Sequence, residues 1–486
     1  MTPEPHRPGS ERPERPEPRW AGHMIWWRIY PLGFVGAFPE PPAGPARPGE
    51  HRLLRVIDWL DHAVTLGASG VALGPIFASS SHGYDTLDHF AIDPRLGDDS
   101  DFDRLADAAK ERGLRLQLDG VFNHLSRHHP LVQDALRQGP GGDGARWFRQ
   151  VSDGRGQVAL GTFEGHDQLV TLDHDEPAVR AYVVKVMRHW LDRGADAWRL
   201  DAAYSVPTAF WADVLTQVRR SHPDAWFEAE VIHGDYAAFV AESTADTVTQ
   251  YELWKAVWSS IEDGNFFELD WALQRHNAML ATFAPATFVG NHDVTRIASR
   301  ITDPRHLPHA VALLAVLGGT PTVYAGDEFG FRAVKEERLG GDDAIRPEFP
   351  PHPPTDPPPS PSSTPHPPSG LPPSPSGTPH PPSGAEVFDL YRRLLGLRRR
   401  HPWLHRARSR ARVLRNRQYV ITLEADGAAL DLALNLDDVE LPTDPAAVVL
   451  DCDAASRELR GAVAPHGWSI SVAEPGASGD EQGVVT

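Results

Sequence analysis

The sequence predicts an α/β fold, namely a (β/α)8 TIM barrel with a short inserted loop domain after strand 3 and a small C-terminal antiparallel β domain. Apolar β-type runs alternate with amphipathic helical patterns, which indicates a parallel sheet with crossover helices. Eight such runs occur, and eight parallel strands close this type of barrel. The chain has 486 residues, 41% of them apolar, so it can bury a substantial core. A doubly wound sheet is the alternative.

The eight expected strands follow one another along the barrel part of the chain. They lie at residues 24–30, 70–73, 114–119, 195–200, 225–231, 247–251, 286–290 and 321–325. The clearest helix between them covers residues 179–193, with Pro177 in its first turn and Gly194 after its end. Its apolar residues fall on one helical face: Val183, Val186, Met187, Trp190 and Leu191. Residues 385–400 are expected to form the last barrel helix.

The domain organisation follows from these elements and from two proline-rich stretches. We expect a disordered tail at 1–22, the barrel at 23–407, the C-terminal β domain at 408–474 and a disordered tail at 475–486. A long connection after the third strand predicts an inserted domain at about 125–175. Of the 46 prolines, 29 lie in residues 1–50 and 350–384. We interpret the stretch at 350–384, which repeats TPHPPSG, as a solvated polyproline-like insertion, although a ligand for a proline-binding module is the alternative.

Composition excludes several classes of protein. The chain carries 47 basic and 66 acidic residues, a formal net charge of −19, which argues against nucleic-acid binding through phosphates. Its single cysteine, Cys452, excludes a disulfide scaffold and a cysteine-rich zinc module. The sequence shows neither an apolar run of the roughly 18 residues that a membrane helix needs nor a secretory signal. We therefore expect a cytoplasmic protein without a nucleic-acid or membrane partner.

Polar residues follow several of the expected strands, at the end of the barrel where chemistry is usually found. Three of them are carboxylic acids: Asp201 after strand 4, Glu230 at the end of strand 5 and Asp293 after strand 7. A retaining glycosidase needs a carboxylate nucleophile about 5–5.5 Å from a carboxylic acid, with an oxocarbenium-like centre between them. The three acids therefore favour glycoside hydrolysis.

The residue types around the first two acids fit this chemistry. Arg199 lies two residues before Asp201, and side chains at this spacing on a strand face the same side. We expect the guanidinium to keep Asp201 ionised at neutral pH. Glu230 has the opposite requirement, because an acid catalyst must hold its proton until the leaving oxygen takes it. Its pKa should therefore be raised.

Each of these residues also has an ordinary structural explanation. Arg199 and Asp201 could form an ion pair without a catalytic role, and the Asn-His-Asp segment at 291–293 could be a turn or a helix cap. Glu228 and Glu230 could both be solvated, and a cluster of histidine, aspartate and glutamate could hold a metal. The joint occurrence of these groups after successive strands favours the catalytic interpretation.

Several segments resemble the signature regions of the α-amylase family, glycoside hydrolase family 13. WWRIYP at 26–31 resembles the opening strand of that family, and GTPTVYAGDE at 319–328 resembles its eighth strand. Its four signature regions are matched by DGVFNH at 119–124, WRLDAA at 198–203, EAEV at 228–231 and VGNHD at 289–293. The resemblance extends over residues 26–403, nearly the whole barrel.

The resemblance implies a role for each candidate site residue. Asp201 would be the nucleophile, Glu230 the general acid and base, and Asp293 a ligand of sugar hydroxyls that stabilises the distorted ring. The implied substrate-binding residues are Tyr84 as an aromatic platform, His124, Arg199 and His292, with Asp85 and Arg296 as a supporting pair.

The expected function is a retaining α-glucoside hydrolase that acts on α-1,4-linked glucans or maltooligosaccharides through a covalent glycosyl-enzyme intermediate. Ala202 after the implied nucleophile is small, which in the family favours α-1,4 linkages. A transglycosylase or trehalose-forming isomerase on the same barrel is one alternative. A catalytically inactive binding scaffold is the other, and it predicts the loss of at least one catalytic carboxylate, whereas all three are present.

No metal or other cofactor is expected, and an α-glucan or maltooligosaccharide is the only predicted partner. Asn123 occupies a position that binds calcium in many members of the family. Calcium needs six or more oxygen ligands, and the short inserted loop offers no obvious set. The sequence makes no prediction about the oligomeric state.

Overall fold

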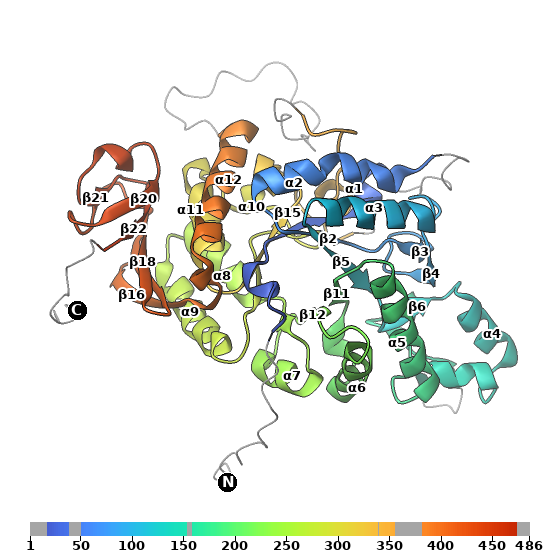
Figure 1. The fold of residues 1–486 in the computed structure, drawn as a ribbon. Coiled ribbons are helices and arrows are strands. Elements are labelled where there is room, and N and C mark those ends of the chain that lie inside the picture. Colours follow the sequence, from blue (N-terminus) through green and yellow to red (C-terminus); the bar gives the residue numbers. More distant parts are fainter. Residues whose placement is uncertain (1–16, 38–49, 153–157, 339, 355–381, 474–486) are drawn as a thin grey trace, which may run out of the picture.

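The computed structural model in Figure 1 describes residues 17–37, 50–152, 158–338, 340–354 and 382–473. Most of the two predicted tails and the repeated part of the proline-rich insertion lie outside these residues. The sequence analysis placed residues 17–22 in a disordered tail. The structure instead describes them as an ordered segment, which corrects that prediction. The ring of Trp20 packs against Trp26 and Trp226, with ring centroids 6.3 and 6.2 Å apart. One aromatic residue with a distant partner thus orders a segment whose composition is otherwise polar.

Eight parallel strands form the central sheet, in the order β13-β12-β11-β5-β2-β1-β15-β14. They are β1 (Trp26–Ile29), β2 (Gly70–Leu73), β5 (Arg115–Gly120), β11 (Ala197–Leu200), β12 (Trp226–Ala229), β13 (Thr247–Val248), β14 (Ala286–Phe288) and β15 (Thr320–Tyr324). An isolated parallel bridge between Thr249 and Ala286 joins the two outer strands. The sheet is therefore a nearly closed barrel, which confirms the predicted fold class. A doubly wound sheet is excluded, because its outer strands remain apart.

An apolar cluster fills the end of the barrel where the strands begin. Trp26, Ala197 and Trp226 are the first residues of β1, β11 and β12, and all three are completely buried. Trp26 lies beside Gly70 of β2, where an added Cβ atom would come within 2.4 Å of the indole ring. Glycine is therefore needed at this strand position, because a side chain would collide with the indole.

A polar layer lies further along the same strands. Arg28 donates hydrogen bonds to Gln117 Oε1 at 3.1 Å and to Glu228 Oε1 at 3.2 Å, and Gln117 donates to Glu228 Oε2 at 3.1 Å. All three side chains are buried, and such groups remain in a core only when they bind one another. Glu228 thus belongs to the interior of the barrel, below the strand end that carries Glu230.

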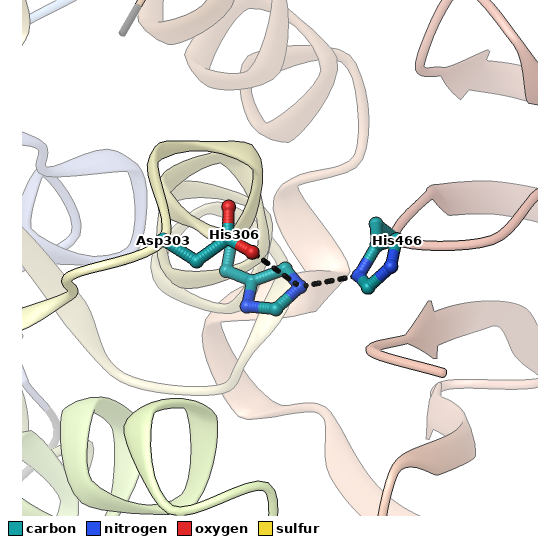
Figure 2. Close-up of side chains that lie close together, drawn as sticks. All are labelled: Asp303, His306 and His466. Carbon is teal, nitrogen blue, oxygen red and sulfur yellow. Dashed lines mark hydrogen bonds and ion pairs between the residues drawn. The ribbon is translucent and has the colours of Figure 1, made fainter. Parts of the chain in front are cut away.

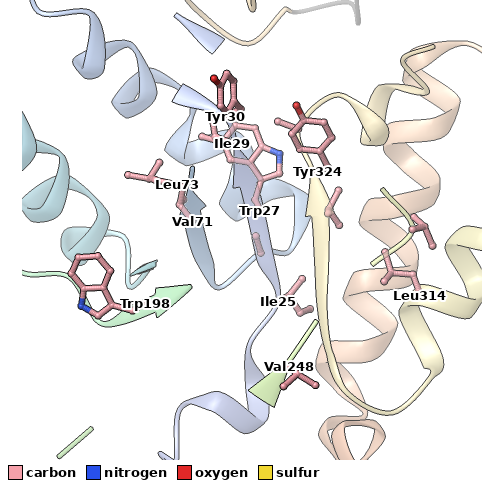
Figure 3. Close-up of a cluster of buried hydrophobic side chains, with 14 of the residues drawn as sticks. Ile25, Trp27, Ile29, Tyr30, Val71, Leu73, Trp198, Val248, Leu314 and Tyr324 are labelled. Carbon is pink, nitrogen blue, oxygen red and sulfur yellow. The ribbon is translucent and has the colours of Figure 1, made fainter. Parts of the chain in front are cut away.

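The outward faces of the strands are apolar and pack against the surrounding helices. Figure 3 shows part of this core, in which Trp27 and Ile29 of β1 lie beside Val71 and Leu73 of β2. These residues alternate along the strands with the inward-facing ones, as the period of a strand requires.

The helices that surround the barrel lie between its strands in the sequence. They are α1 (Pro31–Phe34), α2 (Leu60–Leu66), α3 (Asp99–Glu111), α5 (Pro177–Asp192), α6 (Thr208–Arg219), α7 (Tyr236–Ser243), α8 (Tyr251–Glu262), α9 (Phe266–Leu280), α10 (Ile297–Arg300), α11 (Leu307–Val316) and α12 (Gly384–Arg400). The helices predicted at 179–193 and 385–400 are α5 and α12, so both predictions hold to within a few residues. No helix in the described part of the chain is both long enough and apolar enough to cross a membrane.

The connection between β5 and α5 forms a small substructure of its own. It contains β6 (His124–Ser126), α4 (Pro130–Gln138), β7 (Gln150–Ser152), β8 (Val158–Leu160), β9 (Thr162–Phe163) and β10 (His166–Thr171). β10 pairs antiparallel with both β6 and β9. Because β6 begins only a few residues after β5, this substructure starts at the edge of the strand ends that carry the candidate site.

The C-terminal part is an antiparallel sheet, as predicted. Its strands are β16 (Arg408–Leu414), β17 (Gln418–Ala425), β18 (Ala428–Asn435), β20 (Val448–Cys452) and β22 (Trp468–Val472), in the order β16-β17-β18-β22-β20. In Figure 1 this sheet, in red, lies beside α9 and α11, on the opposite side of the barrel from α4. His309 of α11 contacts the backbone oxygens of Asn435 and Gly467 at 3.1 and 2.9 Å, which ties the sheet to the barrel.

Candidate active site

The strand register brings the predicted acids to the same end of the barrel. Leu200, the last residue of β11, pairs with Ala229 of β12. Asp201 and Glu230 are the next residues, and the backbone N–H of Glu230 donates to Leu200 O at 3.0 Å. Asp293 lies in the loop after β14. The three acids therefore lie at the same end of the barrel, with Asp201 and Glu230 on neighbouring strands and Asp293 beyond β13.

Arg199 is the centre of the first charge cluster. Its Nη1 lies 2.7 Å from Asp119 Oδ1 and 3.3 Å from Asp201 Oδ1, and its Nη2 donates to Glu230 Oε1 at 2.5 Å. One guanidinium thus binds three carboxyl groups, all of them buried. Asp201 receives the longest of these contacts. The sequence placed Arg199 beside Asp201, but it did not predict the closer contacts of Arg199 with Asp119 and Glu230.

Burial and mutual repulsion control the ionisation of the two acids. The pKa of Asp201 is raised well above its usual value by burial and by the neighbouring negative charge of Glu230, although Arg199 acts to lower it. Burial also raises the pKa of Glu230, against the opposing effect of Arg199. The raised pKa of Glu230 agrees with the sequence prediction. The expectation that Arg199 keeps Asp201 readily ionised is corrected, because desolvation and the second carboxylate outweigh the shared cation.

The chain turns sharply directly after Asp201. Ala202 has a φ of 45°, in the left-handed region that alanine seldom adopts. This turn directs the backbone N–H of Ala202 at Glu230, and it donates to Oε2 at 2.9 Å. The strained residue therefore fixes one oxygen of the carboxyl group while Arg199 holds the other.

Tyr251, at the start of α8, reaches the same carboxyl group from another side. Its hydroxyl donates to Glu230 Oε1 at 3.4 Å and accepts a hydrogen bond from Asn291 Nδ2 at 3.0 Å. This contact links the strand end of Glu230 with the loop that carries Asp293. Every oxygen of Glu230 is thus held by a donor from the protein.

Asp293 lies in a second cluster that the sequence did not reveal in full. Arg346 Nη2 is 2.9 Å from Asp293 Oδ1, and His292 Nε2 is 3.1 Å from Asp293 Oδ2. Burial acts to raise the pKa of Asp293, but His292, Arg346 and Arg199 outweigh it, so the pKa is lowered. The carboxyl group of Asp293 therefore stays ionised, whereas the pKa values of Asp201 and Glu230 are raised.

Tyr84 and two histidines surround the space between the clusters. The Tyr84 hydroxyl donates to Asp119 Oδ2 at 3.1 Å and contacts His292 Nε2, and the two rings are parallel with centroids 5.6 Å apart. His124 Nε2 contacts the backbone oxygen of Tyr84 at 2.9 Å, and its ring stacks on Phe163 of β9. Burial lowers the pKa of His124 to about 4 and holds that of His292 well below its usual value, so both imidazoles are neutral near pH 7.

Asp85 and Arg296 do not form the pair that the resemblance implied. Asp85 accepts hydrogen bonds from the backbone N–H and the hydroxyl of Ser81 at 3.1 and 2.6 Å. Arg296 binds Asp327 at 2.8 Å and the backbone oxygen of Ala325, also at 2.8 Å. The buried guanidinium of Arg296 therefore fixes the loop after β15, and the ionic partner of the Asp293 loop is a different arginine.

Arg199 supplies positive charge to the first cluster and Arg346 to the second. Within the described residues, the groups of three or more ligating side chains that lie close enough to hold an ion include neither Asp201, nor Glu230, nor Asp293. Two carboxylic acids that share one cation, beside an ionised aspartate, can attack an electrophilic carbon and deliver a proton in the same site.

The comparison with protein families identifies this arrangement. The family model for the catalytic domain of alpha amylase matches residues 49–350, more than half of the chain. The chain belongs to the alpha-amylase family. All three acids, Tyr84 and both arginines of the site lie within the matched residues of this alpha-amylase-family chain.

Individual relatives agree with this assignment. The chain is 32% identical over 338 residues to a cyclomaltodextrinase from a Bacillus species, which covers 64% of this chain and 60% of that protein. It is 31% identical over 342 residues to neopullulanase 2 from Thermoactinomyces vulgaris, covering 66% and 58% respectively. This alpha-amylase-family chain thus spans about three fifths of the length of the curated relatives it matches.

A solved structure shares the fold of both the barrel and the C-terminal sheet. A cyclic alpha-maltosyl-(1→6)-maltose hydrolase from Arthrobacter globiformis superposes with a TM-score of 0.72 at 24% identity, over 94% of this chain and 100% of that one. The alpha-amylase-family barrel and the C-terminal sheet therefore occur together in a known architecture.

Sequence reasoning missed four residues of the site: Tyr251, Asn291, Arg346 and Asp119, which begins the recognised segment at 119–124. Asn291 stood inside a recognised segment, next to two predicted residues, so its position was the available signal. Tyr251 was expected to end a strand, but it begins α8. Arg346 follows a short 3-10 turn in a loop without periodicity, and no pattern in the sequence connects it with Asp293.

Proposed function

We propose that this protein is a retaining α-glucoside hydrolase that cleaves α-1,4-linked glucans or maltooligosaccharides. The observation that carries the proposal is the pair of buried acids, Asp201 and Glu230, on one guanidinium at the barrel end, beside the ionised Asp293. The names of the relatives, a cyclomaltodextrinase and a neopullulanase, support an α-glucan as substrate. Cyclic and linear maltooligosaccharides are therefore the first substrates to test.

The proposed reaction has two steps. Asp201 attacks the anomeric carbon through a carboxylate oxygen, while Glu230 gives its proton to the leaving glycosidic oxygen, so that a glycosyl ester forms and the aglycone departs. Glu230, now ionised, then takes a proton from water, and the hydroxide oxygen attacks the same carbon and releases Asp201. Two inversions give net retention.

The surroundings of the two acids suit the first step. The first step needs one proton on the pair, carried by Glu230, while Asp201 is ionised. The raised pKa values of Asp201 and Glu230 favour this singly protonated pair near neutral pH. Arg199 stabilises the remaining negative charge. The hydrogen bonds from Ala202 and Tyr251 orient Glu230, so that the proton has a defined position relative to the nucleophile.

Asp293 and the aromatic group complete the proposed substrate site. The ionised Asp293 accepts hydrogen bonds from sugar hydroxyls and opposes the positive charge of the oxocarbenium-like transition state. Tyr84 offers a ring face to a sugar, and His124, Arg199 and His292 supply further polar contacts. Asp85 and Arg296 act in our proposal through the loops that they fix, since each is bound to its own partner.

We further propose the domain division that the sequence suggested: a barrel at 23–407 with an inserted domain at about 125–175, and a C-terminal β domain at 408–474. We also propose a cytoplasmic location, which the single cysteine, Cys452, supports and which cell fractionation would test.

Product chromatography of wild type and two glutamate variants tests the proposed activity. Wild type should release glucose and maltose from maltotriose or from a cyclomaltodextrin, and Glu230→Gln should lower the rate by at least about a thousandfold. Glu228→Gln is the matched control, because Glu228 lies two residues away, is also buried and binds Arg28 and Gln117 of the interior layer.

Two outcomes would contradict the proposal. Transfer products or trehalose without net hydrolysis would favour a transglycosylase or an isomerase on the same site. Full activity of Glu230→Gln, or no turnover of any α-glucoside by folded wild-type protein, would remove the proposed mechanism.

A further inference from the structure

Three metal-ligating side chains meet where the barrel contacts the C-terminal sheet (Figure 2). Asp303 and His306 lie directly before α11, and His466 lies in the turn before β22. His306 Nε2 is 3.0 Å from His466 Nδ1 and 4.0 Å from Asp303 Oδ2. One ligand atom from each residue lies within 4.8 Å of the other two. None of these residues has a part in the proposed reaction.

A fourth residue fixes the tautomer of His466. Asp438 Oδ1 lies 2.9 Å from His466 Nε2, so this nitrogen carries the hydrogen and donates it to the carboxylate. Nδ1 then keeps its lone pair, and it points at His306. A carboxylate that binds the far nitrogen of an imidazole is the usual way in which proteins orient metal-binding histidines.

We propose that Asp303, His306 and His466 bind a divalent transition-metal ion of the zinc type. Two imidazole nitrogens and one carboxylate oxygen, with water in the fourth position, form a common ligand set for zinc. Calcium and magnesium prefer oxygen ligands, so nitrogen from two histidines selects against them. The ion would fasten the C-terminal sheet to the barrel, because its ligands come from both.

The distances require only small movements to admit the ion. Zinc–nitrogen bonds of about 2.0–2.1 Å place the ligands of a tetrahedron about 3.3 Å apart. His306 and His466 would separate slightly from their present 3.0 Å, and Asp303 would approach His306 from 4.0 Å. Asp303 and both histidine rings are partly exposed, so the ion and its water have access from solvent.

Arg305 competes with a metal ion for Asp303 in this cluster. Its Nε and Nη2 donate to the two oxygens of Asp303 at 3.0 and 2.6 Å. A metal must share Asp303 with this guanidinium and must tolerate its positive charge. Removal of Arg305 should therefore tighten zinc binding at this cluster, whereas binding elsewhere on the surface would not respond.

Calorimetric titration of zinc into the metal-stripped full-length chain tests the proposal. We expect one zinc ion per wild-type chain at this site, and affinity at least tenfold lower in His306→Ala and in His466→Ala. Asp438→Asn should weaken binding about 10- to 100-fold, because the carboxylate that orients the imidazole of His466 is lost. Arg305→Gln should strengthen it. His222→Ala is the matched control, since His222 also contacts a carboxylate, Asp192, but lies outside the cluster.

Thermal unfolding gives a second readout on the same proteins. Zinc bound only to the folded state should raise the wild-type Tm, and more so in Arg305→Gln, but not in the two histidine variants. The proposal is overturned if wild type binds no zinc, or if folded His306→Ala and His466→Ala bind it like wild type. Asp438→Asn and Arg305→Gln keep all three ligands, so unchanged affinity in both would also contradict the proposal even if the histidine variants failed to fold.

Discussion

Replacement of Arg346 by glutamine tests how much this arginine contributes to the function of Asp293. The sequence did not reveal that Arg346 is an ionic partner of Asp293. Arg346 Nη2 donates to Asp293 Oδ1 and Nε donates to His292 O, both at 2.9 Å, while the guanidinium lies over the ring of Tyr30. Glutamine has a similar length but no charge and no planar fork of donors. The variant therefore leaves Asp293 in place without its cation.

The expected loss follows from the burial of the pair. The side chain of Arg346 is 5% exposed and that of Asp293 is 29% exposed. A hydrogen bond to a charged group contributes about 1.5–3 kcal/mol, and the partial exposure of Asp293 excludes the larger values found for fully buried pairs. If the transition state loses this amount, kcat/KM falls about 10- to 150-fold, since 1.4 kcal/mol corresponds to a factor of ten.

The pH dependence of activity reports how the loss of Arg346 changes the pKa of Asp293. Arg346 is one of the groups that lower the pKa of Asp293 against the effect of burial. Its removal raises this pKa, so that a larger fraction of Asp293 is protonated at any acidic pH. The acidic limb of kcat/KM should therefore fall more steeply in Arg346→Gln than in wild type, because protonation of Asp293 adds to the titration of the Asp201–Glu230 pair.

Steady-state kinetics on maltotriose from acidic to neutral pH measures both effects. Arg219→Gln is the control, because Arg219 forms a largely buried ion pair with Asp246 at 2.8 Å, away from the site. The control should lose stability but keep its kcat/KM. Unchanged kcat/KM and pH profile in Arg346→Gln would refute our reasoning, and so would equal losses of activity in both variants.

Four further substitutions, at three positions, test other parts of the structure. Gly70→Ala should lower the free energy of unfolding in urea by about 1–3 kcal/mol, because its Cβ atom would lie 2.4 Å from the ring of Trp26; an unchanged midpoint would show that this end of the barrel can relax. Ala202→Gly should stabilise the fold by about 1 kcal/mol by removing strain at a φ of 45°. Ala202→Val should lower stability and activity together, and a Val variant that equals wild type in both would contradict the role of this turn. Tyr84→Phe should lower kcat/KM about 5- to 10-fold, since the hydrogen bond to Asp119 is lost; a wild-type rate would remove Tyr84 from the network.

The barrel was predictable because each of its strands can be recognised from a short stretch of sequence. Each strand is an apolar run bounded by polar or turn residues, and the second strand, Gly70–Leu73, has the predicted bounds. The positions of Asp201, Glu230 and Asp293 were predictable for the same reason, because each follows its strand directly and parallel strands end at one face. Strand periodicity also separates Arg199, which faces the site, from the apolar residues on either side of it.

Pairing between distant loops was not predictable. Arg296 and Asp327 pair across two loops, so the expected partnership of Arg296 with Asp85 had no local pattern to contradict it. Arg346 reaches Asp293 from a turn without periodicity. The order of residues 17–22 depends on tertiary packing of Trp20, which composition does not record. Such contacts form only when the chain closes on itself, and sequence patterns describe one segment at a time.

The central claim is that Asp201 attacks the sugar, and a trapped intermediate tests it most directly. A fluorinated α-glucosyl fluoride forms the glycosyl ester quickly and slows its hydrolysis, so the labelled peptide can be sequenced by mass spectrometry. Our account predicts one fluoroglucosyl group per chain, attached to Asp201, with no label in Asp201→Asn. A label on Glu230 or Asp293, or continued turnover by Asp201→Asn without any covalent adduct, would contradict it.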